Sequence, residues 1–246
     1  DDDREAVVRR SRQAGVEAVV CVGISATSSR AAISLAEQYP YIYAAVGIQP
    51  NYCGEAEPGD WDRVVAMADH PRVVAVGETG LDRYWDFTPM DVQQDYFDRH
   101  LELARQRDLP VVIHCRDAED DLLPMLRAAV GRGSLRGVLH SFSGDAAMAR
   151  QCLDLGLFIS FSGMVTYTNK KLRPLRDVAA TIPDDRILIE TDSPYLVPHP
   201  LRGKQKRNEP AHVSLVAECL AGLRDTDVEQ FAAQTVANAR RLFRLP

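Results

Sequence analysis

One pattern occurs four times in this chain: a short apolar, mostly β-branched run is followed by an acid or a histidine. The runs read VVAVG, VVI, GVL and ILIET, and the residues that follow them are Glu78, His114, His140 and Asp192. Such runs favour buried strands. The segments between them have the apolar spacing of amphipathic helices. Strands that alternate with helices predict right-handed crossovers and a parallel sheet, which restricts the fold to the α/β class.

Seven strands are expected, each preceded by a helix, at residues 15–24, 41–50, 73–78, 109–115, 137–144, 157–163 and 187–192. A helix at 3–14 comes first, where a closed barrel would have a strand before it. We therefore expect a TIM (β/α)8-type barrel that lacks its first strand in this chain, as one domain over residues 1–246. A doubly wound open sheet is the alternative, but no glycine fingerprint for a dinucleotide follows any strand.

The composition narrows the protein class. A hydrophobic share of 46% with 26% charged residues is typical of a soluble globular protein. No apolar run approaches the roughly 18 residues that span a bilayer, and no signal segment stands at the start. The five cysteines include no Cys-x-x-Cys pair, which favours a reducing, cytoplasmic location. A net charge of −6 argues against nucleic-acid binding over the whole surface of the protein but permits local basic patches.

The four residues at strand ends are expected to meet, because the loops after barrel strands converge on one face. Each alone could be a structural histidine or a turn-capping acid, but four at equivalent positions favour one metal site. Two imidazoles and two carboxylates suit Zn²⁺ or a related ion better than a Ca²⁺ cage. Glu78 could bridge two ions, and Asp192 could be a ligand or a general base. Cys115, next to His114, should face the helices and pack there.

Five motifs extend the pattern: GETGLD at 77–82, IHCRDA at 113–118, LHSFSG at 139–144, ETDSPYL at 190–196 and RNEP at 207–210. In these motifs the chain resembles the TatD-like metal-dependent hydrolases, amidohydrolase-type barrels whose usual activity is deoxyribonuclease. The resemblance implies two divalent ions, which are either zinc or else magnesium or manganese. It also implies that Glu78 bridges both ions, that His114 and His140 hold one of them, and that Asp192 holds the other.

The chain departs from the family pattern in two places. The family has a His-x-His at the end of its first strand, and this sequence contains none. Where members read Gly-Ile-His-Pro-His, residues 47–51 read GIQPN. Gln49 and Asn51 can form hydrogen bonds but cannot exchange protons near pH 7. The first departure leaves one metal site short of its two imidazoles.

Two groups of basic residues follow expected strands: Lys170, Lys171, Arg173 and Arg176, and then Arg202, Lys204, Lys206 and Arg207. They predict an anionic substrate such as DNA or a nucleotide, although the first group could also be the solvated face of a helix. The residues expected to contact substrate are Tyr84, Lys204, Arg207, Asn208 and Glu209. Tyr84 and Trp85 could stack a base, or Trp85 could anchor its loop.

Three hypotheses follow from these residues. The first is a metal-dependent hydrolase of phosphodiester bonds, most simply a TatD-like deoxyribonuclease that uses a metal-activated water. The second keeps the metal site but cleaves an ester or amide, for example on an aminoacylated RNA, because loops set the chemistry of a barrel. The third is a barrel that binds a phosphorylated ligand without turnover. No membrane contact and no obligate protein partner are expected.

Overall fold

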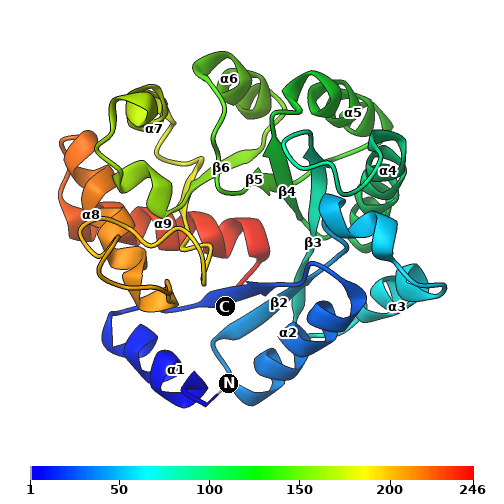
Figure 1. Ribbon diagram of the computed structural model, residues 1–246, viewed down its shortest axis with the longest axis horizontal. Coiled ribbons are helices and arrows are strands. Elements are labelled where there is room, and N and C mark those ends of the chain that lie inside the picture. Colours follow the sequence, from blue (N-terminus) through cyan, green and yellow to red (C-terminus); the bar gives the residue numbers. More distant parts are fainter. Residues whose placement is uncertain (1) are drawn as a thin grey trace.

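The computed structural model describes residues 2–246, so Asp1 of the expected domain lies outside the described part. Seven strands form one curled sheet in chain order, and each strand is parallel to the next (Figure 1). The strands are β1 (Val19–Val22), β2 (Ile42–Val46), β3 (Val73–Asp82), β4 (Val111–Arg116), β5 (Gly137–Leu139), β6 (Phe158–Phe161) and β7 (Ile187–Ile189). The predicted α/β barrel-type fold is confirmed.

The helices of the described residues lie around the outside of the sheet, except for α9 (Val228–Phe243), which packs against its other face (Figure 1). They are α1 (Arg4–Gln13), α2 (Ala26–Gln38), α3 (Asp60–Met67), α4 (Met90–Arg107), α5 (Glu119–Arg132), α6 (Ala146–Asp154), α7 (Arg173–Thr181), α8 (Val213–Leu223) and α9 (Val228–Phe243). Four 3₁₀ turns connect them: η1 (Pro50–Glu55), η2 (Gly163–Thr166), η3 (Lys170–Leu172) and η4 (Pro210–His212). Within residues 2–246, none of the helices combines the length and apolar character needed to cross a membrane.

Both faces of the sheet are buried. Fully buried side chains from the helices, such as Ile33, Phe97 and Leu122, pack on the outer face. A second cluster joins the sheet to α9, and its members are Ala45, Ala75, Val112, Val138, Phe158, Leu188 and Leu242. Burial on two faces explains why the strands read as continuous apolar runs. Most polar residues of the strands lie in their second halves, towards the carboxyl ends where the site lies.

Strand β3 is longer than expected. The glycines after Val76 indicated an end at Glu78, but the strand continues to Asp82 after a shift in its register with β4. Gly77 and Gly80 have φ angles of 134° and 139°, which disfavour any side chain. A Cβ at Gly80 would lie 2.0 Å from the carbonyl oxygen of His114. The glycines thus let β3 lie close against β4 and carry two acids, four positions apart, to one edge.

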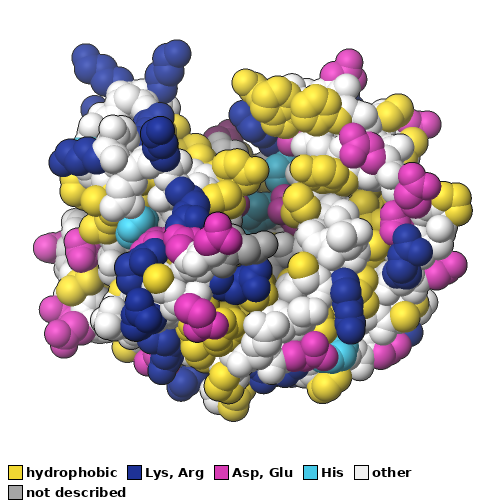
Figure 2. All heavy atoms as spheres, turned by 60° about the horizontal axis from the view of Figure 1, so that its bottom comes forward, with side chains coloured by type: hydrophobic (Ala, Val, Ile, Leu, Met, Phe, Trp, Pro, Cys, Tyr) yellow, Lys and Arg dark blue, Asp and Glu magenta, His cyan; other side chains and the backbone are white. Residues whose placement is uncertain are grey.

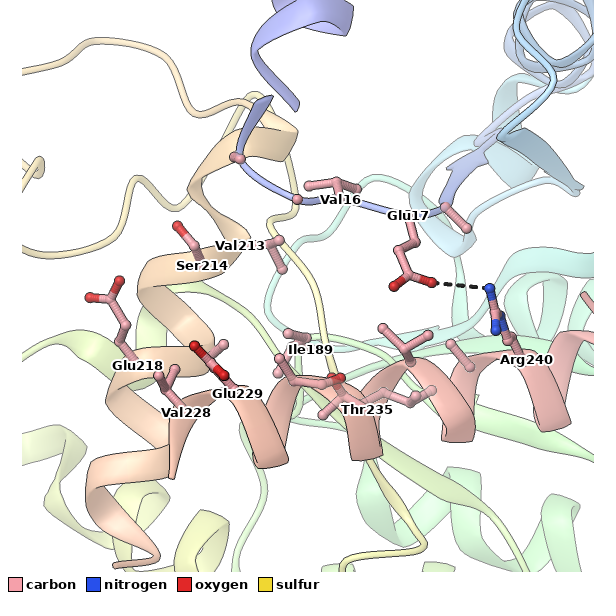
Figure 3. Close-up of a pocket in the computed structure, with 18 of the residues that line it drawn as sticks. Val16, Glu17, Ile189, Val213, Ser214, Glu218, Val228, Glu229, Thr235 and Arg240 are labelled. Atoms are coloured by element: carbon pink, nitrogen blue, oxygen red, sulfur yellow. Dashed lines mark hydrogen bonds and ion pairs between the residues drawn. The ribbon is translucent and has the colours of Figure 1, made fainter. Parts of the chain in front are cut away.

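Strands β1 and β7 are the two outer strands of the sheet, and they are not neighbours in it among residues 2–246. A pocket of about 310 Å³ lies beside this seam, between residues 14–18, β7, α8 and α9 (Figure 3). The Arg240 side chain of α9 forms an ion pair of 3.0 Å with Glu17 in this pocket. The described sheet thus has the seven strands expected from the sequence and is open between its first and last strands.

Candidate metal centre

Three side chains from neighbouring strands meet at the carboxyl end of the sheet. Glu78 of β3, His114 of β4 and His140, directly after β5, each place a ligand atom within 4.8 Å of the other two. His114 Nδ1 lies 3.0 Å from Glu78 Oε1, and His140 Nε2 lies 3.1 Å from the same oxygen. The structure thus brings together three of the four residues that the strand ends singled out.

Each imidazole has a second carboxylate on its far side. His114 Nε2 lies 2.8 Å from Asp82 Oδ2, and His140 Nδ1 lies 3.3 Å from Glu190 Oε1. The Ser160 hydroxyl donates to the other oxygen of Glu190 at 2.5 Å. A carboxylate at the outer nitrogen holds a proton there and leaves the inner nitrogen with a free lone pair. Both rings therefore turn their inner nitrogens towards Glu78.

Asp82 also organises the loop after β3. The residue is only 1% exposed. Its Oδ1 accepts hydrogen bonds from the backbone of Tyr84 at 2.9 Å and of Trp85 at 3.0 Å. Its Oδ2 accepts from Asn51 Nδ2 at 3.1 Å, besides its contact with His114. Sequence reasoning missed this role because it ended the strand at Glu78; a strand continued by four residues would have placed both acids on one face.

The electrostatics of the cluster favour positive charge. Burial would raise the pKa of Glu78, but the two imidazoles hold it well below its ordinary value. Burial would lower the pKa of each imidazole, but Asp82 and Glu78 raise that of His114. Glu78 and Glu190 raise the pKa of His140 well above its ordinary value.

Asp192 lies close enough to sense the same charges. Burial raises its pKa to about 6, and although His140 opposes this, Glu190 and Glu78 contribute to the rise. Its carboxylate is outside the three-residue group whose atoms lie within 4.8 Å of one another. Asp192 comes three residues after the end of β7, and the charges of the cluster act on its carboxylate.

The residues present fit a divalent cation. His140 Nε2 is buried and makes no hydrogen bond, even though it lies near Glu78. Two imidazole nitrogens and a carboxylate oxygen within 4.8 Å of one another form a donor set suited to Zn²⁺ and related ions. Cys115 is outside the group, and burial raises the pKa of its thiol to about 12. Cys115 therefore packs away from the ligand atoms of the group.

Residues 47–51, which read GIQPN, are linked to Asp82 by hydrogen bonds. Gln49 is 8% exposed, and its Oε1 accepts the backbone N–H of Asn51 at 2.8 Å. Asn51 in turn donates to Asp82. The backbone N–H of Ile48 donates to Nε2 of the fully buried His100 at 3.0 Å. These contacts make Gln49 and Asn51 parts of the framework around Asp82.

The predicted substrate contacts near residue 208 have partners within the chain. Asn208 is 2% exposed, and its amide donates to the carbonyl oxygens of Thr191 and Leu196. It thereby fastens the loop that carries Asp192. Glu209 binds Arg10 of α1 through both oxygens, at 2.8 and 2.6 Å.

Arg207 forms an ion pair with Asp3, and Lys204 is exposed. Contact of Lys204, Arg207, Asn208 and Glu209 with a substrate stays a prediction.

The surface of the protein has a hollow with contrasting sides (Figure 2). Figure 2 shows histidine atoms in this hollow, with basic side chains on its left bank and hydrophobic ones on its right. After β6, a pocket of about 190 Å³ is lined by Lys170, Arg173 and Arg176, among others. Arg176 Nε is buried there without a hydrogen-bond partner. The arrangement offers positive charge to an anionic group.

Comparisons with known proteins agree with this geometry. The family model described as TatD related DNase matches residues 1–244. The uncharacterized metal-dependent hydrolase YabD of Bacillus subtilis is 41% identical over 245 residues, which cover 100% of this chain and 94% of that protein. The 3'-5' ssDNA/RNA exonuclease TatD of Salmonella typhimurium is 37% identical over 98% of this chain and 93% of its own. The crystal structure of YJJV, a TatD homolog from Escherichia coli, superposes with a TM-score of 0.91 and 32% identity, covering 100% of this chain and 93% of that one.

Proposed function

Because the chain belongs to the TatD-related DNase family of metal-dependent hydrolases, we propose that it is an exonuclease that removes nucleotides from single-stranded DNA or RNA. The observation that carries this proposal is the convergence of Glu78, His114 and His140 on one point. The basic pocket after β6 supplies positive charge for a phosphate chain. A relative that is 37% identical is named as such an exonuclease.

In this proposal, Glu78, His114 and His140 would hold one divalent ion, and Glu78 and Asp192 would contribute to holding a second. A cation bound there supplies Lewis-acid polarisation of the scissile phosphate and makes water a nucleophile at neutral pH. Zinc is the first choice for an imidazole-rich site, with manganese and magnesium as alternatives. Residues 1–246 act as one hydrolase domain.

Two carboxylates determine which nitrogen of each imidazole carries a proton, and a third transfers the proton of the reaction. Asp82 keeps a proton on His114 Nε2, and Glu190 keeps one on His140 Nδ1, so the inner nitrogens stay available. Asp192 accepts the proton of the attacking water and returns it to the leaving oxygen. Burial raises the pKa of this carboxyl group, and a raised pKa makes a carboxylate a better proton acceptor.

All five cysteines are free, as a reducing compartment would keep them. The cytoplasmic location stays a prediction.

The test is a nuclease assay with matched histidine variants. The purified protein is incubated with an end-labelled single-stranded oligonucleotide and Zn²⁺, Mn²⁺ or Mg²⁺, with and without a chelator. We expect the unchanged protein to release nucleotides. We expect the same of His70→Ala, because the His70 imidazole is outside the cluster and lies 3.3 Å from the Glu37 carboxylate. His140→Ala and chelation should stop the release.

No release with any of the three ions, from a folded protein that binds them, would overturn the proposal. Cleavage of an aminoacyl ester but not of the oligonucleotide would favour the esterase hypothesis. Tight oligonucleotide binding with no cleavage of either substrate would favour the binding barrel.

A further inference from the structure

Three aromatic rings lie exposed on the loop between β3 and α4. Tyr84, Trp85 and Phe87, here called the aromatic ladder, are 53%, 44% and 64% exposed. The rings of Trp85 and Phe87 are stacked, with centroids 5.2 Å apart and planes at 8°. Tyr84 meets Trp85 edge-on at 4.9 Å. A contiguous exposed group of large rings marks a binding surface more often than chance exposure does.

The loop that carries the ladder is held rigidly at both ends. Gln93 of α4 is 2% exposed. Its Oε1 accepts from the backbone N–H of Asp82, and its Nε2 donates to the carbonyl oxygens of Asp82 and Thr88. The Asp82 carboxylate adds two bonds to the backbone of Tyr84 and Trp85. The rings are thus presented on a pre-organised backbone, which lowers the entropic cost of binding.

One face of the ladder is free. The guanidinium of Arg116 lies 3.6 Å from the centroid of the Tyr84 ring and covers it. The same group is 5.8 Å from the Trp85 ring. Phe87, the most exposed of the three, is left as the outer ring of the Trp85–Phe87 stack. A flat ring system could therefore extend the stack at Phe87, with a cation nearby.

The ladder is tied to the metal centre through one side chain. Asp82 binds the ladder's backbone with Oδ1 and the imidazole of His114 with Oδ2. Arg116 belongs to β4, two residues after His114. The loop after β6, with its basic pocket, follows another strand of the same curled sheet. Figure 2 shows hydrophobic and basic banks on opposite sides of the hollow.

From these contacts we propose that the aromatic ladder is a base-stacking platform, on which a nucleobase of a single strand lies against Phe87. This inference rests on the proposed nuclease function and names the part of the substrate that this loop reads. A ligand that combines flat rings with a phosphate chain matches a metal centre that has exposed aromatic rings on the loop after β3 and a basic pocket after β6. Stacking on aromatic rings tolerates any base but needs a base that is free of its duplex neighbours. The platform therefore selects single strands.

The experiment measures binding, with EDTA present so that no strand is cut. The chain has two tryptophans, so Trp61→Phe leaves Trp85 as the only source of tryptophan fluorescence. Two probes of equal length are used, a deoxythymidine oligomer and its abasic counterpart. We expect the thymidine oligomer to quench Trp85 and the abasic one to leave its emission unchanged.

Substitutions at Phe87 separate stacking from simple apolar contact. In the otherwise unchanged protein, anisotropy of fluorescein-labelled oligomers should show that Phe87→Leu and Phe87→Ala weaken thymidine binding by about 10-fold or more. Phe87→Trp should retain it. Binding of the abasic oligomer should not respond to any of the three changes.

Equal binding of the two oligomers, or a Phe87→Leu variant that binds thymidine as the parent does, would overturn the platform. If both of these binding results are obtained and the protein still releases nucleotides, the nuclease function is retained and the platform is rejected. If Trp85 is quenched by bases but no strand is ever cut with metal, the platform stands and the nuclease function falls.

Discussion

Replacing Asp82 by asparagine tests whether an outer carboxylate sets the state of a metal ligand. The two side chains have the same shape, but an amide has one acceptor and one donor end. If the amide oxygen keeps the two loop N–H groups, its NH₂ faces His114 Nε2. That nitrogen must then accept, and the proton moves to Nδ1, the atom that lies 3.0 Å from Glu78. A protonated Nδ1 has no lone pair for a metal.

The opposite orientation of the new amide group is also unfavourable. With its oxygen towards His114, the NH₂ of the new side chain faces the N–H groups of Tyr84 and Trp85, which now lack an acceptor. Unsatisfied buried donors cost about 1–3 kcal/mol each. Loss of an outer partner of a metal-binding histidine typically weakens affinity by about 10- to 100-fold. That range corresponds to about 1.4–2.7 kcal/mol of binding free energy.

The assay is calorimetric titration of the metal-free protein with Zn²⁺, with circular dichroism to confirm that each variant is folded. Asp121→Asn is the matched control, because it makes the same change at an acid that pairs with Arg83. We expect Asp82→Asn to lose at least tenfold in affinity and Asp121→Asn to bind as the parent does. A folded Asp82→Asn protein with unchanged affinity would refute the reasoning about the tautomer.

Three other predictions concern the framework and the basic pocket. Gly80→Ala adds a Cβ 2.0 Å from a backbone oxygen, so urea unfolding should show that the free energy of unfolding falls by about 2–4 kcal/mol. The control Gly131→Ala has open space around its new Cβ, so its free energy of unfolding should rise by up to about 1 kcal/mol. Similar unfolding midpoints for the two variants would contradict this. Burial lowers the pKa of His100 from 6.5 to about 4, so its contribution to stability is complete above pH 6.5 and is lost as the pH falls towards 4. That loss is about 3 kcal/mol, and the acid limb of a stability–pH curve should be flatter in His100→Gln; identical limbs would count against it. Arg176→Glu should weaken oligonucleotide binding and reduce its dependence on salt, and an unchanged salt slope would show that the pocket touches no phosphate.

The sequence predicts the fold and most of the cluster because both depend on local patterns. Apolar runs of strand length, separated by amphipathic helices, leave few topologies other than a parallel curled sheet. Once the sheet is parallel, residues at equivalent strand ends share one edge. Glu78, His114 and His140 could therefore be grouped before any coordinates were known, and the structure places them together.

The role of Asp82 depends on geometry that a local pattern does not contain. Glycines usually end a strand, so the pair around Glu78 indicated a stop. In the structure the same glycines, at positive φ, let β3 continue against β4 and bring Asp82 to His114. Long-range pairs were equally hidden: Glu209 binds Arg10, which is 199 residues away in the chain. The RNEP motif identified the segment but not its partner.

The charges of the cluster link metal binding to protons. Glu78, Asp82 and Glu190 surround two imidazoles and raise the pKa of both, so without an ion the site favours protons on the inner nitrogens as well. A divalent cation needs the same lone pairs and is favoured by the same carboxylates, so it competes with protons for the site. Affinity must then fall as the pH falls, and it falls further because Asp192 becomes protonated below about pH 6. The carboxylates that orient the imidazoles thus also set the lowest pH at which the site can hold its ion.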